Sequence, residues 1–202
     1  MNKLFFYYSH NPHDFFQYFQ VHRDNINLIN AIFTNIVVVY FMLEKKQFYI
    51  NGEWILPSKS NDFIVINPSN EEPCATISLG SLEDTNKAVK AAKDAFLIWK
   101  NTSKEERLDL LEKLLKIYTR RSEEMTEAIS TELGAPLDWA SSAQTSSGES
   151  HIEDFIKRLK EFKFEYNFEE GSDSHIVYEP IGVCGLITPW NWPINQIALK
   201  VI

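Results

Sequence analysis

The chain has 202 residues, of which 44% are hydrophobic and 24% charged, which is enough to form one or two domains with a hydrophobic core. Its formal net charge is -8 at pH 7. A field of this sign repels phosphate, so we expect neither nucleic acids nor anionic membranes as partners. The two cysteines, Cys74 and Cys184, are far apart in the sequence. This pattern suits a reducing, cytoplasmic location and predicts no metal site.

Residues 1–41 differ in composition from the rest of the chain, being rich in Asn, Phe, Tyr and Ile. The stretch from Ile26 to Leu43 has the length of a short membrane span, but asparagines interrupt it and only Ile36 to Leu43 is continuously apolar. Two interpretations stay open: a membrane tether, and an extension upstream of a native start at Met42. We therefore divide the chain into an atypical extension, 1–41, and a folded part, 42–202.

Short strands are expected from Gln47 onward. Asn51-Gly52 lies between short apolar segments, which is typical of a hairpin with a type I′ turn. Another strand is predicted from Phe63 to Ile66, just before Asn67-Pro68.

Three helices are predicted between residues 81 and 134, with the third beginning at Ser122 and ending at Leu133-Gly134. The first two have capping boxes, formed by Ser81 with Asp84 and by Ser103 with Glu106. The apolar stripe of the first helix contains Val89, Ala92, Phe96 and Trp99. We expect these stripes to lie in the core.

The stretch from Ser141 to Gly148 is poor in helix formers, so it is either a loop or a weakened helix. A helix resumes by His151, and its expected buried side contains Ile152, Phe155, Ile156, Leu159 and Phe162. His151 has no metal-ligand spacing around it, which favours a surface or capping role.

Aromatic residues alternate with polar ones from Phe162 to Phe168, which is the period of a strand with one apolar face. Gly171-Ser172 turns the chain, and His175 to Tyr178 returns. These features predict a β-hairpin at about residues 162–180.

The stretch from Tyr178 to Pro193, YEPIGVCGLITPWNWP, has the strongest positional constraints in the chain. Its run from Ile181 to Ile187 predicts a strand buried on both faces, as in a parallel sheet. Proline then ends the strand, and Pro193 suits the first turn of a helix containing Ile194, Ile197 and Val201.

Asn191 lies in the loop between this strand and this helix, where open α/β sheets place ligands. Its carboxamide has two N–H donors and does not ionise, so it can stabilise an oxyanion. The alternative is that Asn191 caps the following helix. Spacing alone does not decide between these two roles.

The segment ITPWNWP after EPIGVCG resembles the NAD(P)-dependent aldehyde dehydrogenase superfamily, at the point where the first strand of the cofactor domain enters the active site. The similarity extends from about Gln47 to the end of the sequence. It implies that Asn191 donates to the oxyanion of the thiohemiacetal. It also implies that the NAD or NADP nicotinamide is lined by Ile187, Thr188, Pro189 and Trp190.

The resemblance implies an α/β fold that is the truncated amino-terminal part of the aldehyde dehydrogenase fold. This part would be a partial Rossmann-like cofactor-binding domain with helices over residues 42–202, plus an oligomerisation hairpin at about 162–180. The complete enzyme is expected to oxidise an aldehyde to a carboxylic acid and to form a homo-oligomer.

The family's nucleophilic cysteine and its general base, a glutamate, lie downstream of the segment that matches Asn191. We expect Cys184 to be a structural thiol, because a buried strand would block access to it. The chain is therefore interpreted as a fragment that is inactive alone. The alternatives are a non-catalytic oligomerisation or interaction module and a protein tethered to a membrane through residues 26–43.

Overall fold

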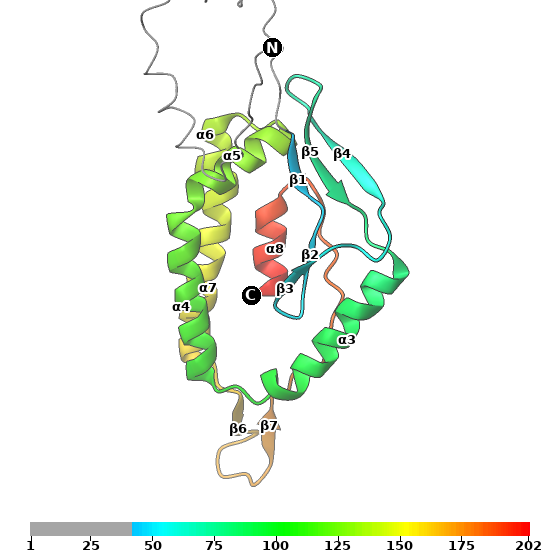
Figure 1. The fold of residues 1–202 in the computed structure, drawn as a ribbon. Helices are drawn as coiled ribbons and strands as arrows, with labels where there is room; N and C mark the ends of the chain where they lie inside the picture. Colours follow the sequence, from blue (N-terminus) through cyan, green and yellow to red (C-terminus); the bar gives the residue numbers. More distant parts are fainter. Residues whose placement is uncertain (1–41) are drawn as a thin grey trace, which may run out of the picture. The chain divides into compact units, whose positions relative to one another are not determined.

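Short strands form the first part of the folded chain and helices most of the remainder (Figure 1). The computed structural model describes residues 42–202. The predicted membrane segment, 26–43, lies outside these residues apart from its last two positions. Within residues 42–202, no helix combines the length and the apolar character that crossing a bilayer requires.

The largest sheet has three strands, in the order β1 (Leu43–Lys45), β5 (Glu72–Ser78) and β4 (Asp62–Asn67). β5 runs parallel to β1 and antiparallel to β4, and Ala75 of β5 pairs with Leu43 on one side and Val65 on the other. Ala75 is buried, because β5 is the central strand. The strand predicted from Phe63 to Ile66 is confirmed within β4.

A second, two-stranded sheet is the hairpin of β2 (Phe48–Ile50) and β3 (Glu53–Ile55). Both residues of its turn have positive φ, 55° at Asn51 and 84° at Gly52. Two consecutive positive φ values are the requirement of a type I′ turn, which Asn and Gly meet with little strain. The predicted hairpin is confirmed.

The three predicted helices are present as α3 (Leu82–Trp99), α4 (Lys104–Arg120) and α5 (Ser122–Leu133). Both capping boxes form, with the Ser81 and Ser103 hydroxyls accepting from the N–H groups of Asp84 and Glu106. α5 ends at Gly134, whose φ of 75° is the left-handed conformation of a helix C-terminus.

The apolar stripe of α3 is not core, which corrects the prediction from its helical spacing. Val89 is 39% exposed and Trp99 47% exposed. The helix contacts β2, but the elements within residues 42–202 do not form a layer over the rest of its apolar face. Helical spacing identifies a face that can be buried, and burial also requires a neighbouring element.

Residues 137–161 form one continuous helical run, made of α6 (Leu137–Trp139), the π-helix η3 (Ala140–Thr145) and α7 (Ser146–Glu161). The weakened-helix alternative for Ser141 to Gly148 is therefore correct, and the loop alternative is wrong. α4 and α7 pack side by side (Figure 1), with Ile152 and Ile156 of α7 buried. Phe162 follows the end of α7 and is exposed, so its predicted place on the buried side was wrong.

The hairpin predicted at residues 162–180 is present as β6 (Glu165–Asn167) and β7 (His175–Val177). These strands pair antiparallel, with Tyr166 opposite Ile176. The role of this hairpin in oligomerisation stays a prediction.

The segment from Ile181 to Ile187 does not form the predicted buried strand. It has no regular secondary structure, and Ile181 is 94% exposed and Ile187 88% exposed. A parallel strand needs hydrogen-bonded neighbours and helices over its faces. No strand within residues 42–202 pairs with this segment, which explains the difference. The helix predicted after it is confirmed as α8 (Pro193–Val201), with proline in its first turn.

Gly148 of α7 allows two other helices to approach closely. A Cβ atom at this position would lie 2.9 Å from Cζ of Tyr118 on α4 and 3.0 Å from Cγ1 of Ile194 on α8. The Tyr118 ring cannot easily yield, because its hydroxyl donates a 2.7 Å hydrogen bond to the Thr145 carbonyl. The packing of α4, α7 and α8 therefore depends on the absence of a side chain at Gly148.

We predict that Gly148→Ala destabilises the chain. Overpacking costs about 1–3 kcal/mol, whereas the gain in helix propensity is about 1 kcal/mol, so the net change is a loss. Urea unfolding followed by circular dichroism measures it. Gly185→Ala is the control, because no atom lies within 4 Å of its added Cβ. Equal unfolding midpoints for Gly148→Ala and the native chain would contradict this packing.

We also predict that the segment from Ile181 to Ile187 binds an apolar fluorescent dye, because large exposed apolar groups form such sites. The double variant Ile181→Ser with Ile187→Ser should lose most of the dye fluorescence. Leu82→Ser, which removes another exposed aliphatic side chain, should keep it. Equal losses in the two variants would show that the dye does not select this segment.

Candidate functional site

Asn191 is exposed in the loop that precedes α8. The residue at the N-cap of α8 is Trp192, and no side chain makes a capping hydrogen bond there. The helix-cap alternative for Asn191 is therefore wrong in this structure. No side-chain hydrogen bond joins Asn191 to another residue within 42–202, so both N–H donors of its carboxamide are free to bind an anion.

The other predicted site residues lie immediately before Asn191 in the same exposed run. Ile187, Thr188, Pro189 and Trp190 are all exposed, and none belongs to a helix or strand. The indole of Trp190 and the side chain of Ile187 present apolar surface to the solvent. Such surface suits contact with a flat nicotinamide ring, so the residues present fit the cofactor that the sequence implies.

Cys184 lies in the segment from Ile181 to Ile187, and it is exposed. The prediction of a buried thiol is therefore wrong, for the same reason as the predicted strand: no neighbouring strand covers it within the described residues. Its closest polar contact is weak, with Sγ 3.9 Å from the Gly182 carbonyl oxygen.

The chain after Asn191 is held by two contacts to the helical run of residues 137–161. The Asn195 amide is hydrogen-bonded to Nε2 of His151 at 2.9 Å. The Trp192 ring meets the Trp139 ring edge to face, with centroids 5.9 Å apart. His151 is thus half-buried and anchors α8, a role that the expectation of a surface or capping histidine did not include.

A buried polar cluster lies at the π-helix beneath α8. The hydroxyls of Thr126 and Thr145 are hydrogen-bonded at 2.9 Å, and Tyr118 donates to the carbonyl of Thr145. Burial raises the pKa of Tyr118 to about 12, and the nearby charge of Glu149 adds to this shift. The phenol therefore stays protonated and keeps its hydrogen bond throughout the physiological range of pH.

Gln144 of the π-helix is buried, and its Oε1 has no hydrogen-bond partner within residues 42–202. The polar composition from Ser141 to Gly148 indicated a weakened helix, but it did not reveal this cluster. Tyr118 and Thr126 come from α4 and α5, and only the folded chain brings them to Thr145.

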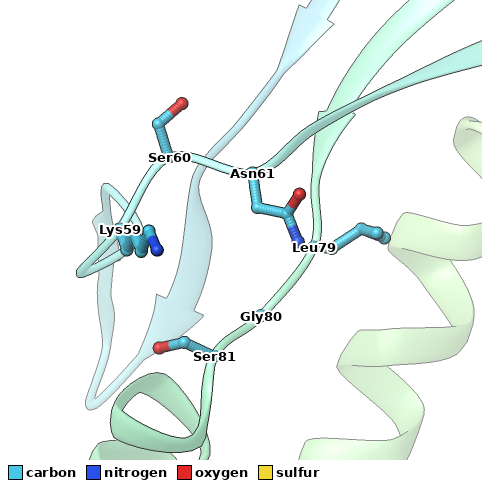
Figure 2. Close-up of a pocket in the computed structure, with 6 residues that line it drawn as sticks. All are labelled: Lys59, Ser60, Asn61, Leu79, Gly80 and Ser81. Atoms are coloured by element: carbon cyan, nitrogen blue, oxygen red, sulfur yellow. The ribbon is translucent and has the colours of Figure 1, made fainter.

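A small hollow of about 250 Å³ lies where the β3–β4 and β5–α3 connections meet (Figure 2). Its lining residues are Lys59, Ser60, Asn61, Leu79, Gly80 and Ser81. The polar groups at its α3 end are already occupied, because Asp84 accepts from the N–H groups of Ser58 and Ser81. The Ser81 hydroxyl also donates to Asp84, and this hydrogen bond together with the two backbone bonds holds the pKa of Asp84 well below its usual range. We assign this hollow a structural role in capping.

Among the residues that the structure describes, no group of three or more His, Cys, Asp or Glu side chains could hold a metal ion.

The chain is similar to known proteins over most of its described length. Residues 54–202 match the family described as the aldehyde dehydrogenase family. The 3-succinoylsemialdehyde-pyridine dehydrogenase of a Pseudomonas species is 43% identical over 161 residues, which cover 79% of this chain and 33% of that protein. The chain therefore spans about a third of the length of the curated relatives that it matches.

Solved structures agree with this match. An aldehyde dehydrogenase from Bartonella henselae is 56% identical and superposes with a TM-score of 0.78, over 79% of this chain and 34% of that one. Aldehyde dehydrogenase C of Pseudomonas syringae, solved with NAD+ and octanal, is 37% identical with a TM-score of 0.73, over 77% of this chain and 32% of that one. The resemblance and the α/β fold class predicted from the sequence are confirmed: this chain belongs to the aldehyde dehydrogenase family.

Proposed function

We propose that residues 42–202 contribute the oxyanion donor and part of the cofactor surface to an enzyme that oxidises an aldehyde to a carboxylic acid. The observation that carries this proposal is the carboxamide of Asn191, which has no hydrogen-bond partner in the part of the chain that the structure describes and is exposed at the end of the run from Ile187 to Trp190. Family membership supports the assignment. NAD+ is the proposed cofactor, since the similar Pseudomonas syringae enzyme was solved with it.

In the proposed reaction, attack on the aldehyde carbonyl places negative charge on its oxygen. The Asn191 amide donates a hydrogen bond to that oxygen and stabilises a charge that the free aldehyde lacks. Because the amide does not ionise, it retains both donors at any physiological pH. NAD+, when bound, accepts the hydride that leaves the former aldehyde carbon. Ile187 and Trp190 orient the nicotinamide ring and exclude water from one side of it.

The anchoring contacts of α8 keep the Asn191 donor in place. The Asn195 to His151 hydrogen bond and the Trp192 to Trp139 contact hold the residues that follow Asn191. A donor that is already oriented stabilises the oxyanion without a reorganisation cost during the reaction. His151 and Asn195 are thus positioning residues, since they act through Asn191 and do not touch the substrate.

We propose further that the 202 residues alone do not catalyse the oxidation. The nucleophile must be a thiolate formed beside a base. Within residues 42–202, the two thiols have only backbone carbonyls as hydrogen-bond acceptors, that of Val65 for Cys74 and that of Gly182 for Cys184. The enzyme's nucleophile and its water-activating glutamate therefore belong to parts of the fold outside these residues. The complete enzyme is proposed to assemble as a homo-oligomer with the hairpin of β6 and β7 at a subunit interface.

The first prediction for function is that the purified chain produces no NADH from NAD+ with octanal. Oxyanion donors contribute only about 10² to 10³ in rate, and they act on an attack that this chain does not make. Absorbance at the NADH maximum measures the reaction, with wild-type aldehyde dehydrogenase C of Pseudomonas syringae as the positive control, since that protein was solved with octanal. NADH formation that disappears in Cys184→Ala would show that this thiol is the nucleophile and would refute the proposal.

The second prediction uses a chimera in which residues 42–202 replace the matching third of the Bartonella henselae enzyme. The 56% identity over this region makes an active chimera the expected result. Asn191→Ala in the chimera should lower kcat by about 10² to 10³, with a much smaller change in NAD+ affinity. Steady-state kinetics and NAD+ titration measure both quantities.

The matched control is Asn101→Ala, another exposed asparagine, whose amide donates to the Leu97 carbonyl and which takes no part in the proposed site. Losing this hydrogen bond should cost about 1 kcal/mol of stability and leave most of the turnover intact. If Asn191→Ala instead lowers the melting temperature and leaves kcat unchanged, its role is structural and the oxyanion proposal is wrong.

A further inference from the structure

The α3–α4 connection lies next to the base of the β6–β7 hairpin (Figure 1). A groove of about 520 Å³ is formed by residues of these two parts and of α4. Three cationic side chains line it, those of Lys100, Lys104 and Arg107. Three aromatic side chains face the same groove, those of Phe162, Phe164 and Tyr178. Its volume is within the range of small-molecule sites, which combine an apolar lining with a few polar groups.

The aromatic wall is held by contacts between its own rings. The centroid of Phe162 lies 4.9 Å from that of Phe164 and 5.3 Å from that of Tyr178, and both pairs are close to edge-to-face. Aromatic pairs in this geometry gain energy beyond the burial of their surface. The wall therefore presents fixed ring surfaces to an occupant of the groove.

Arg107 is oriented toward the aromatic wall. Its guanidinium carbon lies 5.6 Å from the Phe164 ring centroid and 5.9 Å from the Trp99 ring centroid. Its Nε donates a 2.9 Å hydrogen bond to the hydroxyl of Thr102. These contacts occupy the faces and one edge of the guanidinium. The terminal nitrogens make no hydrogen bond to other residues within 42–202, and they can form a paired hydrogen bond with a carboxylate.

The charge of the groove is not neutralised by the described part of the chain. None of its three cations lies within ion-pair distance of a carboxylate in residues 42–202, although Glu179 also lines the groove. Lys104 donates to the carbonyl oxygens of Lys160 and Phe162 at 3.1 and 3.5 Å, which holds its ammonium at the groove edge. Elsewhere lysines pair with acids, as Lys46 does with Asp62 at 2.9 Å.

We propose that this groove binds an organic anion that combines a flat apolar ring with a carboxylate. The ring would pack on Phe162, Phe164 and Tyr178, and the carboxylate would pair with Arg107 and Lys100. In a chain of net charge -8, an unpaired cluster of positive charge is a local exception that attracts anions. The proposal uses neither Asn191 nor the nicotinamide surface, so it stands or falls independently of the proposed function.

The test is equilibrium dialysis of the full 202-residue chain against naphthalene-2-carboxylate, with neutral naphthalene-2-methanol as a matched probe. The carboxylate should bind at least about 10-fold more tightly than the alcohol, because a charge-assisted bidentate pair is among the stronger hydrogen bonds. Raising the salt concentration to about 1 M should remove most of this difference, since the groove is open to solvent. Equal affinities for the two probes, or no binding of the carboxylate at 1 mM, would overturn the proposal.

Three variants locate the bound anion. Arg107→Gln should weaken carboxylate binding by about 10-fold, because arginine can form two parallel hydrogen bonds with a carboxylate. Lys100→Gln should weaken it by about 3-fold, because lysine pairs as a single charge. Lys113→Gln, an exposed lysine of α4 that does not line the groove, should leave the affinity unchanged. If circular dichroism shows that Arg107→Gln does not fold, the affinity of Lys100→Gln tests the proposal instead, because the Lys100 side chain is exposed. Equal affinities in Lys100→Gln and Lys113→Gln would place the anion elsewhere and refute the proposal.

Discussion

The close packing of α4, α7 and α8 around Gly148 is the constraint on which the candidate site depends. No Cβ atom fits where the main chain of Gly148 meets Tyr118 and Ile194. This contact determines the position of the first turn of α8, which contains Ile194. Asn191 precedes α8 by only two residues, so its position follows from that of the helix. An interior packing contact can in this way determine the geometry of the proposed oxyanion donor.

Local signals in the sequence predicted local structure well. Asn51-Gly52 forms its turn and Ser81 caps its helix, because each signal depends on atoms a few residues apart. Predictions that needed a distant neighbour were wrong where residues 42–202 supply none. The segment from Ile181 to Ile187 lacks a paired strand, and Val89 of α3 lacks a covering layer. An apolar pattern shows which face can be buried but not what buries it.

The candidate site shows the same difference between features that a local pattern predicts and features that depend on distant contacts. Asn191 and the run from Ile187 to Trp190 were proposed from a short motif, because the extended segment and the helix on either side of Asn191 are consecutive in the chain. The contact of Asn195 with His151 joins residues 44 apart in sequence, and neither residue has a local pattern that marks it. The cationic and aromatic groove likewise gathers side chains from the α3–α4 connection, from α4 and from the base of the hairpin, which only the folded chain brings together.

The exposure of Asn191 sets a physical limit on what these residues do alone. A hydrogen-bond donor stabilises an oxyanion strongly only where water is excluded, because water competes for the donor and screens the charge. Within residues 42–202, Ile187, Trp190 and Asn191 are all open to solvent. The same surface that exposes them is apolar, so covering it would both release water and strengthen the field of the amide. Folding energy and catalytic electrostatics therefore favour the same event in the proposed enzyme, which is the burial of this segment.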